Sequence, residues 1–230
     1  MVLNWKLYKL KDVADLATGF PFKSNLYENL GLLKVVRGIN VTEGNIRWGG
    51  DSRFWNHSIE ALKKYLVEID DIVIGMDGSK IGKNRAIVRE DDIPAILAQR
   101  VALVRAKPQL AHQKYLWQLI NNISFERYIE NVKTGTSIPH MSLGQVGDFK
   151  IVLPSLPEQR AIASILSALD DKIELNLQMN KTLEEMAMTL YKHWFVDFGP
   201  FKDGEFVSSE LGEIPKGWEV GELERLFILQ

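Results

Sequence analysis

The polar side chains of this chain that could do chemistry are concentrated in segments rich in glycine and turn residues. They are Lys23, Arg37, Asn40, Arg47, Trp48, Ser79, Lys80, Lys83, Asn84, Arg85, Gln99, Arg100, Thr134, Thr136, Ser137 and His140. Lys and Arg supply charge for phosphates, and Arg, Asn and Gln can offer paired hydrogen bonds to base edges. A lone loop Arg is usually only solvated, so the hypothesis of DNA binding depends on the whole set.

Carboxylates beside one apolar run offer a competing chemistry. Asp70 and Asp71 begin the run, and Asp77 and Lys80 follow it. Two carboxylates and a lysine near a strand can hold a metal ion and activate water, as in a metal-dependent nuclease. The spacing is poor, because Lys80 lies three residues after Asp77 rather than two. Surface carboxylates that flank a buried strand are the simpler interpretation, and a nuclease centred on Asp71 and Asp77 is the alternative.

Other catalytic motifs are missing from the sequence. The segment GSKIGK, residues 78–83, is not a phosphate-binding loop, because three residues separate its glycines and no Ser or Thr follows Lys83. The four histidines are scattered, and the absence of cysteine excludes disulfides and thiolate metal sites. We therefore expect no catalytic residue, metal or cofactor in this chain.

Residues 1–153 predict an α+β domain that carries these loops. Short apolar runs rich in β-branched residues predict strands at residues 32–41, 71–76, 85–90, 95–106 and 148–154. Residues 4–18 favour a short strand and a short helix, residues 45–48 another strand, and residues 112–132 a helix with an apolar period. We expect a mixed or antiparallel sheet with helices packed on it.

Residues 156–194 predict one long helix with a heptad repeat. No Gly interrupts the run before Gly199, and Pro157 and Glu158 suit a first helical turn. At 1.5 Å per residue the helix would reach about 55–60 Å, more than a small domain needs to cover its core. The expected helix-pairing residues, in the a and d positions of a coiled coil, are Leu166, Leu169, Ile173, Asn176, Asn180, Leu183, Ala187, Leu190 and Trp194.

Two asparagines interrupt the apolar seam of this helix. Asn176 and Asn180 would cost stability there, since a buried amide must find a partner. Such residues mark register and orientation in paired helices. An ordinary amphipathic helix that covers a core is the alternative.

The charge of the chain divides between these two parts. Residues 1–153 hold 21 Lys and Arg against 16 Asp and Glu, whereas residues 154–230 hold 7 against 14. The first part is compatible with a polyanionic partner, and the acidic second part suits protein contacts. Neither an apolar signal segment nor a long apolar window is present, so we expect a soluble cytoplasmic protein.

A succession of motifs runs through essentially the whole chain. The region around the predicted helix contains LPSLPEQRAIASILSALDDKIELN and MNKTLEEMAMTLYKHWFVDF, and the other motifs are GFPFKSNLY, LVEIDDIVIGMDGSKIGK, ILAQRVALVRA, TGTSIPHMS and LGEIPKGWEV. The most specific pattern is PEQ-x-x-I-A-x-x-L-x-x-x-D-x-K-I at residues 157–173. Together these segments closely resemble the specificity subunit of type I restriction-modification systems.

The resemblance implies a non-catalytic DNA-recognition subunit. Residues 1–153 would be a target recognition domain that reads one half of a bipartite site. Residues 154–198 would be the conserved helix that spaces two such domains and docks the methyltransferase. Modification subunits would methylate adenine with S-adenosylmethionine, and restriction subunits would use ATP and Mg²⁺ to translocate and cleave DNA.

The chain departs from the family pattern in its length. Family members usually have two recognition domains, whereas residues 199–230 would provide only a linker and the start of the second. The helix would then lack its antiparallel partner, which leaves Leu166, Leu169, Ile173, Leu183 and Leu190 exposed in a monomer. We expect a homodimer that reads a palindromic site. A coiled-coil assembly protein without DNA binding is the remaining alternative.

Overall fold

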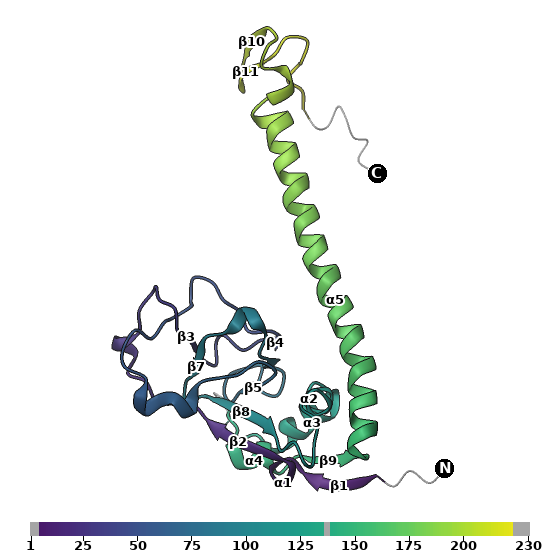
Figure 1. Ribbon diagram of the computed structural model, residues 1–230. Coiled ribbons are helices and arrows are strands. Elements are labelled where there is room, and N and C mark those ends of the chain that lie inside the picture. The colour runs from purple at the N-terminus through teal and green to yellow at the C-terminus, as the bar shows by residue number, and fades with distance from the viewer. Residues whose placement is uncertain (1–4, 136–138, 223–230) are drawn as a thin grey trace. The chain divides into compact units, whose positions relative to one another are not determined.

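The chain forms two compact units, Met1–Ala168 and Leu169–Gln230. The computed structural model (Figure 1) describes residues 5–135 and 139–222. The division between the units falls within the long helix, whereas the sequence places the domain boundary at residue 153. The difference arises because the first turns of the helix pack on the first unit, where Gln159 and Ala163 are buried.

The first unit is organised around a five-stranded sheet. Its strand order is β2 (Ala14–Thr18), β8 (Val101–Ala106), β5 (Ile72–Gly75), β6 (Arg85–Ile87) and β4 (Glu43–Gly44). The pairs β2–β8, β8–β5 and β5–β6 are antiparallel, and the β4–β6 pair is parallel. The mixed sheet with helices confirms the predicted α+β class.

The central strand β5 is buried on both faces. Its residues Ile72 and Ile74 lie in the core cluster shared with the helices, whereas Val73 lies in the cluster on the opposite face. Alternate side chains of a strand point to opposite faces, so a continuous apolar run fits a strand covered on both sides. The predicted buried strand at residues 71–76 is therefore confirmed.

Two smaller pairs complete the strands of this unit. Strand β1 (Lys6–Lys9) pairs antiparallel with β9 (Lys150–Leu153), and β3 (Lys34–Val36) pairs parallel with β7 (Ala95–Leu97). A further cluster of buried and partly buried residues, which includes several aromatic side chains, surrounds Val35 and Ile96. The β1–β9 pair brings the start of the domain beside its closing strand.

The helices of the first unit are short. They are α1 (Leu10–Val13), α2 (Gln113–Ile120), α3 (Ile123–Val132) and α4 (Leu143–Gly147), with 3-10 turns η1 (Ser24–Leu26), η2 (Glu60–Tyr65) and η3 (Glu90–Asp92). The predicted single helix at residues 112–132 is wrong, because the side chain of Asn122 accepts a hydrogen bond from Ser124 N (2.9 Å) and caps a new helix. The strand predicted at residues 45–48 is also wrong, since only Ile46 forms a bridge.

The long helix α5 covers Leu156–Tyr191 without interruption. Glu158 accepts hydrogen bonds from the backbone N (3.0 Å) and Oγ (2.7 Å) of Ser155, which satisfies a free donor at the helix start. A π-helical turn, η4 (Lys192–Val196), follows directly. The predicted helix over residues 156–194 is thus confirmed, with a changed geometry in its last turn.

The second unit ends in a small hairpin around aromatic side chains. After the turn η5 (Gly199–Phe201), strands β10 (Phe206–Ser209) and β11 (Gly212–Pro215) pair antiparallel. The ring of Trp218 lies 5.3–6.0 Å from the rings of Phe195, Phe198 and Phe201. The predicted linker region therefore has its own local structure up to residue 222.

Candidate nucleic-acid interface

Loops from distant parts of the sequence meet where β5 ends and β8 begins. Met76 N donates to Arg100 O (3.0 Å), and Met141 N donates to Met76 O (2.9 Å). Gly78 N donates to Pro139 O (3.1 Å). We call this group the loop cluster, defined as residues 37–40, 76–84, 98–100 and 139–141.

The segment 37–40 joins this cluster through a close approach of its glycine. A Cβ atom on Gly38 would lie 3.1 Å from Asp77 Oδ1 and 3.8 Å from Arg100 O. That distance is tighter than most real contacts, so the absence of a side chain lets this loop lie against Asp77. The predicted site residues Arg37 and Asn40 thereby come near the 76–84 and 98–100 loops.

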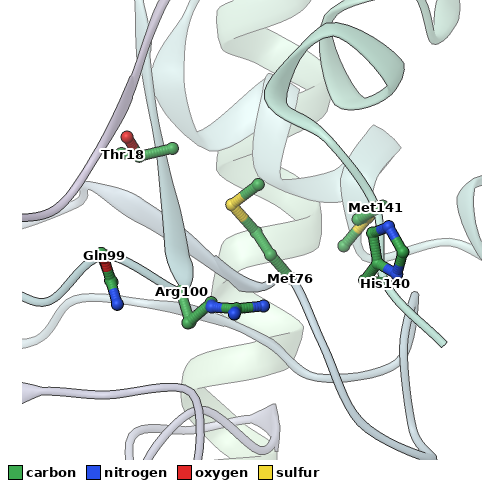
Figure 2. Close-up of a pocket in the computed structure, with 6 residues that line it drawn as sticks. All are labelled: Thr18, Met76, Gln99, Arg100, His140 and Met141. Atoms are coloured by element: carbon green, nitrogen blue, oxygen red, sulfur yellow. The ribbon is translucent and has the colours of Figure 1, made fainter. Parts of the chain in front are cut away.

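A small pocket opens within the loop cluster. Figure 2 shows its lining residues, Thr18, Met76, Gln99, Arg100, His140 and Met141, around a volume of about 170 Å³. Met76 and Met141 supply apolar surface, and the other four residues supply hydrogen-bonding groups. The sequence predicted Gln99, Arg100 and His140 as site residues, and the structure brings these three together.

Arg100 is held at this pocket by one loose ion pair. Its Nη1 lies 3.5 Å from Asp77 Oδ2, and its side chain is 64% exposed. On the opposite side of the pocket, His140 Nε2 lies 2.9 Å from Thr134 Oγ1. The arrangement leaves charged and planar hydrogen-bonding groups accessible at the pocket mouth.

Several predicted cations lie on exposed loops around this part of the unit. Lys23, Arg47, Lys80 and Lys83 are exposed, as is Ser79, whereas Asn84 is only half-exposed. Lys80 Nζ lies 3.5 Å from Glu43 Oε1, an ion pair at the outer limit of a hydrogen bond. Exposed cations of this kind can meet phosphates without a fixed geometry.

Arg37 and Trp48 are tied to neighbouring groups. The Arg37 guanidinium donates to Asp51 O and lies 5.8 Å from the centre of the Tyr27 ring. Trp48 Nε1 donates to Asp92 Oδ1 (2.7 Å), and Lys34 Nζ lies 5.3 Å from the Trp48 ring. Neither side chain is as accessible as its loop position in the sequence suggests.

Asn40 and Arg85 are buried and serve the fold. Asn40 Oδ1 accepts from Arg37 N (3.1 Å), and its Nδ2 donates to Arg47 O (3.1 Å). Arg85 Nη2 pairs with Glu126 Oε1 at 2.6 Å, which connects β6 to α3. Both side chains are buried and most of their polar atoms have partners inside the unit, so we leave Asn40 and Arg85 out of the DNA contacts proposed below. The predicted residues Thr136 and Ser137 lie outside the described residues.

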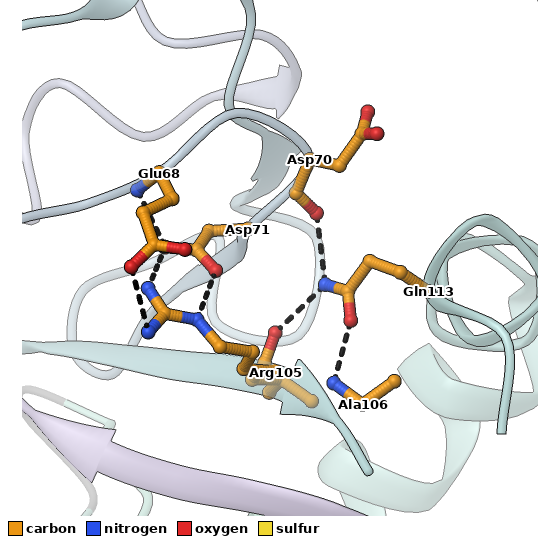
Figure 3. Close-up of polar contacts among 7 residues, drawn as sticks. Glu68, Asp70, Asp71, Arg105, Ala106 and Gln113 are labelled. Atoms are coloured by element: carbon orange, nitrogen blue, oxygen red, sulfur yellow. Dashed lines mark hydrogen bonds and ion pairs between the residues drawn. The ribbon is translucent and has the colours of Figure 1, made fainter. Parts of the chain in front are cut away.

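The carboxylate of Asp71 has a structural partner. Arg105 donates two hydrogen bonds to this carboxylate (Figure 3). Its Nε donates to Asp71 Oδ1 (2.8 Å) and its Nη2 donates to Asp71 Oδ2 (2.6 Å). Glu68 N also donates to Asp71 Oδ2 (2.7 Å). The hydrogen bond to Asp71 raises the pKa of Arg105 above its ordinary value, because it favours the charged guanidinium.

These contacts do not support the nuclease alternative. Asp71 faces Arg105, whereas Asp77 belongs to the loop cluster and pairs with Arg100. Within residues 5–135 and 139–222, no three His, Asp or Glu side chains gather as metal ligands would. Over the same part of the chain, none of the helices combines the length and apolar composition needed to cross a membrane.

The helix-pairing residues lie on a largely uncovered helix. Leu169, Ile173, Leu183 and Leu190 are each more than half exposed, and Trp194 is 43% exposed. Asn176, Asn180 and Ala187 are exposed as well. Leu166 is half-buried rather than exposed, because it lies just beyond the turns that pack on the first unit.

The sequence missed the residues that shape the pocket. Thr18, Met76 and Met141 line it, and Asp77 faces Arg100, although Asp77 was assigned only to the nuclease alternative. No periodic or spacing signal marks these residues, since they converge through sheet pairing and loop hydrogen bonds. The interleaved Arg, Gln and Gly residues were the only sequence signal of this region.

Comparison with known proteins finds one family along most of the chain. A family model described as the type I restriction modification DNA specificity domain matches residues 3–185. The MjaIX specificity subunit of a type I restriction enzyme from Methanocaldococcus jannaschii is 41% identical over 112 residues, which are 48% of this chain and 26% of that protein. The MjaVIII specificity subunit from the same organism is 28% identical over 184 residues, 79% of this chain and 43% of that protein.

A solved structure shares the fold. The S subunit of a type I restriction-modification system from M. genitalium aligns with a TM-score of 0.61 at 19% identity, over 87% of this chain and 49% of that one. The chain spans less than half the length of each of these three proteins.

Proposed function

Because this chain belongs to the family of type I restriction modification DNA specificity domains, we propose that residues 1–153 read one half of a bipartite DNA site. The observation that carries the proposal is the family match over residues 3–185, a range that includes the whole loop cluster. The chain itself performs no catalysis in this proposal. Its work is to choose the DNA sequence on which partner subunits act, which places it in the cytoplasm with the DNA of the cell.

The chemistry of the loop cluster supports this role. Exposed Lys80 and Lys83 suit phosphates, which orient a protein on DNA without reading its sequence. Gln99 and Arg100 carry planar groups that suit base edges. Both kinds of contact are needed for sequence-specific binding, and here both occur on neighbouring loops.

The partners follow from the same proposal. Helix α5 would dock modification subunits that methylate adenine with S-adenosylmethionine. Restriction subunits would add translocation and cleavage driven by ATP and Mg²⁺. The net negative charge of residues 154–230 supports protein contacts rather than DNA contacts for this part of the chain.

We further propose that two copies of the chain pair through α5. More than half of the surface of Leu169, Ile173, Leu183 and Leu190 is exposed, and an apolar stripe of this size favours a partner helix. A two-fold dimer would present two identical recognition domains and would read a palindromic bipartite site. Sedimentation at micromolar concentration tests this directly, and a stable monomer would count against the dimer.

The experiment that tests the proposed function is methylation of a random DNA library. The chain is mixed with its cognate modification subunit and S-adenosylmethionine, and sequencing detects modified adenines. We expect one bipartite motif, palindromic if the dimer forms. The modification subunit without this chain is the control. A complex that assembles but methylates no motif would contradict the proposal.

Two measurements separate the proposal from its alternatives. The nuclease alternative requires Mg²⁺-dependent cleavage by the isolated chain, which we do not expect. The alternative of an assembly protein without DNA binding requires that salt have no systematic effect on DNA affinity. Phosphate contacts release counterions, so we expect the logarithm of the affinity to fall linearly with the logarithm of the salt concentration.

A further inference from the structure

Gln99 and Arg100 occupy a rigid position between two buried strand segments. Ala98 before them and Val101 after them are almost fully buried. Gln99 N donates to Phe20 O (3.0 Å), and Arg100 O accepts from Met76 N (3.0 Å). Two exposed polar side chains therefore project from a backbone fixed on both sides. A base-reading group needs such fixed geometry, whereas a phosphate contact tolerates a mobile one.

Asp77 orients the Arg100 side chain without using all of its donors. One guanidinium nitrogen lies 3.5 Å from Asp77 Oδ2, and Arg100 remains 64% exposed. Arg has five N–H donors in a planar fork, so a single loose contact leaves donors for a second partner. This differs from Arg105, whose guanidinium is occupied by two hydrogen bonds to Asp71.

The pocket beside Arg100 combines this fork with apolar surface. In Figure 2, Met76 lies between Arg100 on one side and Met141 and His140 on the other. A methionine side chain has neither a positive charge nor a hydrogen-bond donor for a phosphate. They suit the edge of a base, and in particular the methyl group of thymine, which is read by apolar contact.

We propose that Gln99 and Arg100 form the base-reading pair of this domain, with Asp77 as the positioning residue that orients Arg100. This inference rests on the proposed function and deepens it. Arg100 reads guanine through paired hydrogen bonds to O6 and N7, and Gln99 reads a neighbouring adenine through N6 and N7. Lys80 and Lys83, on the exposed tip of the adjacent loop, contact phosphates.

The decisive variant is Arg100→Lys, which keeps the charge but loses the planar fork. Wild-type chain and variant, each in complex with the modification subunit, are selected against the same random DNA library, and base preference is measured at each position. We expect the preference for guanine at one position of each half-site to fall by roughly 5- to 150-fold, with the other positions unchanged. Arg127→Lys, at an exposed arginine on α3, is the matched control and should keep the wild-type motif.

Asp77→Asn tests the positioning role. The variant removes the charge that orients Arg100, so the preference should weaken at the same position. Combined with Arg100→Lys it should add no further loss at that position, because both changes act on one interaction. A structural role alone would reduce stability without selecting one base position.

The outcomes distinguish this inference from the proposed function. A motif that Arg100→Lys leaves intact, with an unchanged salt dependence because lysine keeps the charge, would show that Arg100 contacts at most a phosphate, and it would overturn the base-reading pair. The proposed function would survive that result. A wild-type complex that selects no DNA motif would overturn both the base-reading pair and the proposed function.

Discussion

At the scale of residues, the first unit uses its charged side chains in two distinct ways. Asp71 is nearly fully buried and receives the bidentate Arg105, and Arg85 is buried against Glu126. Arg100 and Lys80, in contrast, are more than 60% exposed and make only single contacts at 3.5 Å. The Asp71–Arg105 and Arg85–Glu126 pairs stabilise the fold, whereas the exposed side chains of Arg100 and Lys80 remain available to a ligand.

The buried pair yields a stability prediction. Asp71→Asn should destabilise the first unit by about 2–3 kcal/mol, below the usual cost of breaking a buried pair because Arg105 is partly exposed. Urea unfolding followed by circular dichroism measures the change. Glu68→Gln, which removes the exposed partner of the same arginine, is the control and should cost less than about 1 kcal/mol. Equal effects of the two variants would refute the structural role given to Asp71.

Asp148 gives a prediction for the pH dependence of stability. Hydrogen bonds from Lys11 and Lys9 lower the pKa of its carboxyl from 3.8 to about 2. A lowered pKa in the folded state means that the charged form stabilises the fold above the unfolded pKa. That contribution is lost as the pH falls through the window between 3.8 and about 2.

The test compares wild type with Asp148→Asn. The variant should be less stable at neutral pH, and the difference should shrink steadily as the pH falls from about 4 to 2, since the wild-type carboxyl is then protonated. Thermal unfolding at a series of pH values gives the difference. A gap that stays constant over this window would contradict the assignment.

At the scale of elements, the first turns of α5 pack on the first unit through the buried amide of Gln159 and through Ala163. Gln159 Oε1 accepts from His112 N (2.9 Å), and its Nε2 donates to Pro154 O (3.0 Å) and Leu110 O (3.2 Å). Ala163, one turn further, is fully buried. These contacts hold the first turns of α5 against the rest of the first unit.

Removing that amide should weaken the attachment. Gln159→Ala leaves one buried and two part-buried backbone groups without their partner and should cost about 2–4 kcal/mol. Gln178→Ala, at an exposed glutamine of the same helix, should change stability by less than about 0.5 kcal/mol. Urea unfolding monitored by near-ultraviolet circular dichroism compares the two. If the variants unfold alike, Gln159 does not hold the helix.

At the scale of the whole molecule, α5 exposes an apolar stripe that the chain does not cover by itself within the described residues. The exposed fractions of Leu169, Ile173, Leu183 and Leu190 are 56–59%. Polar residues between these positions, such as Gln178, contribute no apolar surface to the stripe. A stripe of this kind is the physical basis of the proposed dimer.

A charge placed in this stripe should prevent pairing. Leu183→Glu should shift the protein from dimer to monomer at micromolar concentration, because a carboxylate cannot be buried there without a partner. Gln178→Glu adds the same charge on the polar face and should remain dimeric. Sedimentation velocity measures both. A Leu183→Glu variant that stays dimeric would place the interface elsewhere.

The sequence by itself determined the fold class, the buried strand at residues 71–76 and the long helix. These depend on short-range periodicity of apolar residues, which is a local property of the chain. The prediction of a single helix over residues 112–132 was wrong, because the capping side chain of Asn122 divides a continuous apolar period into two helices.

Only the tertiary structure decided which polar residues share a site. Asp77, Arg100 and His140 come from separate loops and meet through backbone pairing of Met76 with Arg100 and Met141. Tertiary contacts also buried Asn40 and Arg85, which look like exposed loop residues in the sequence. The physical reason is that burial and convergence depend on contacts between distant segments, and no local pattern of residues encodes them.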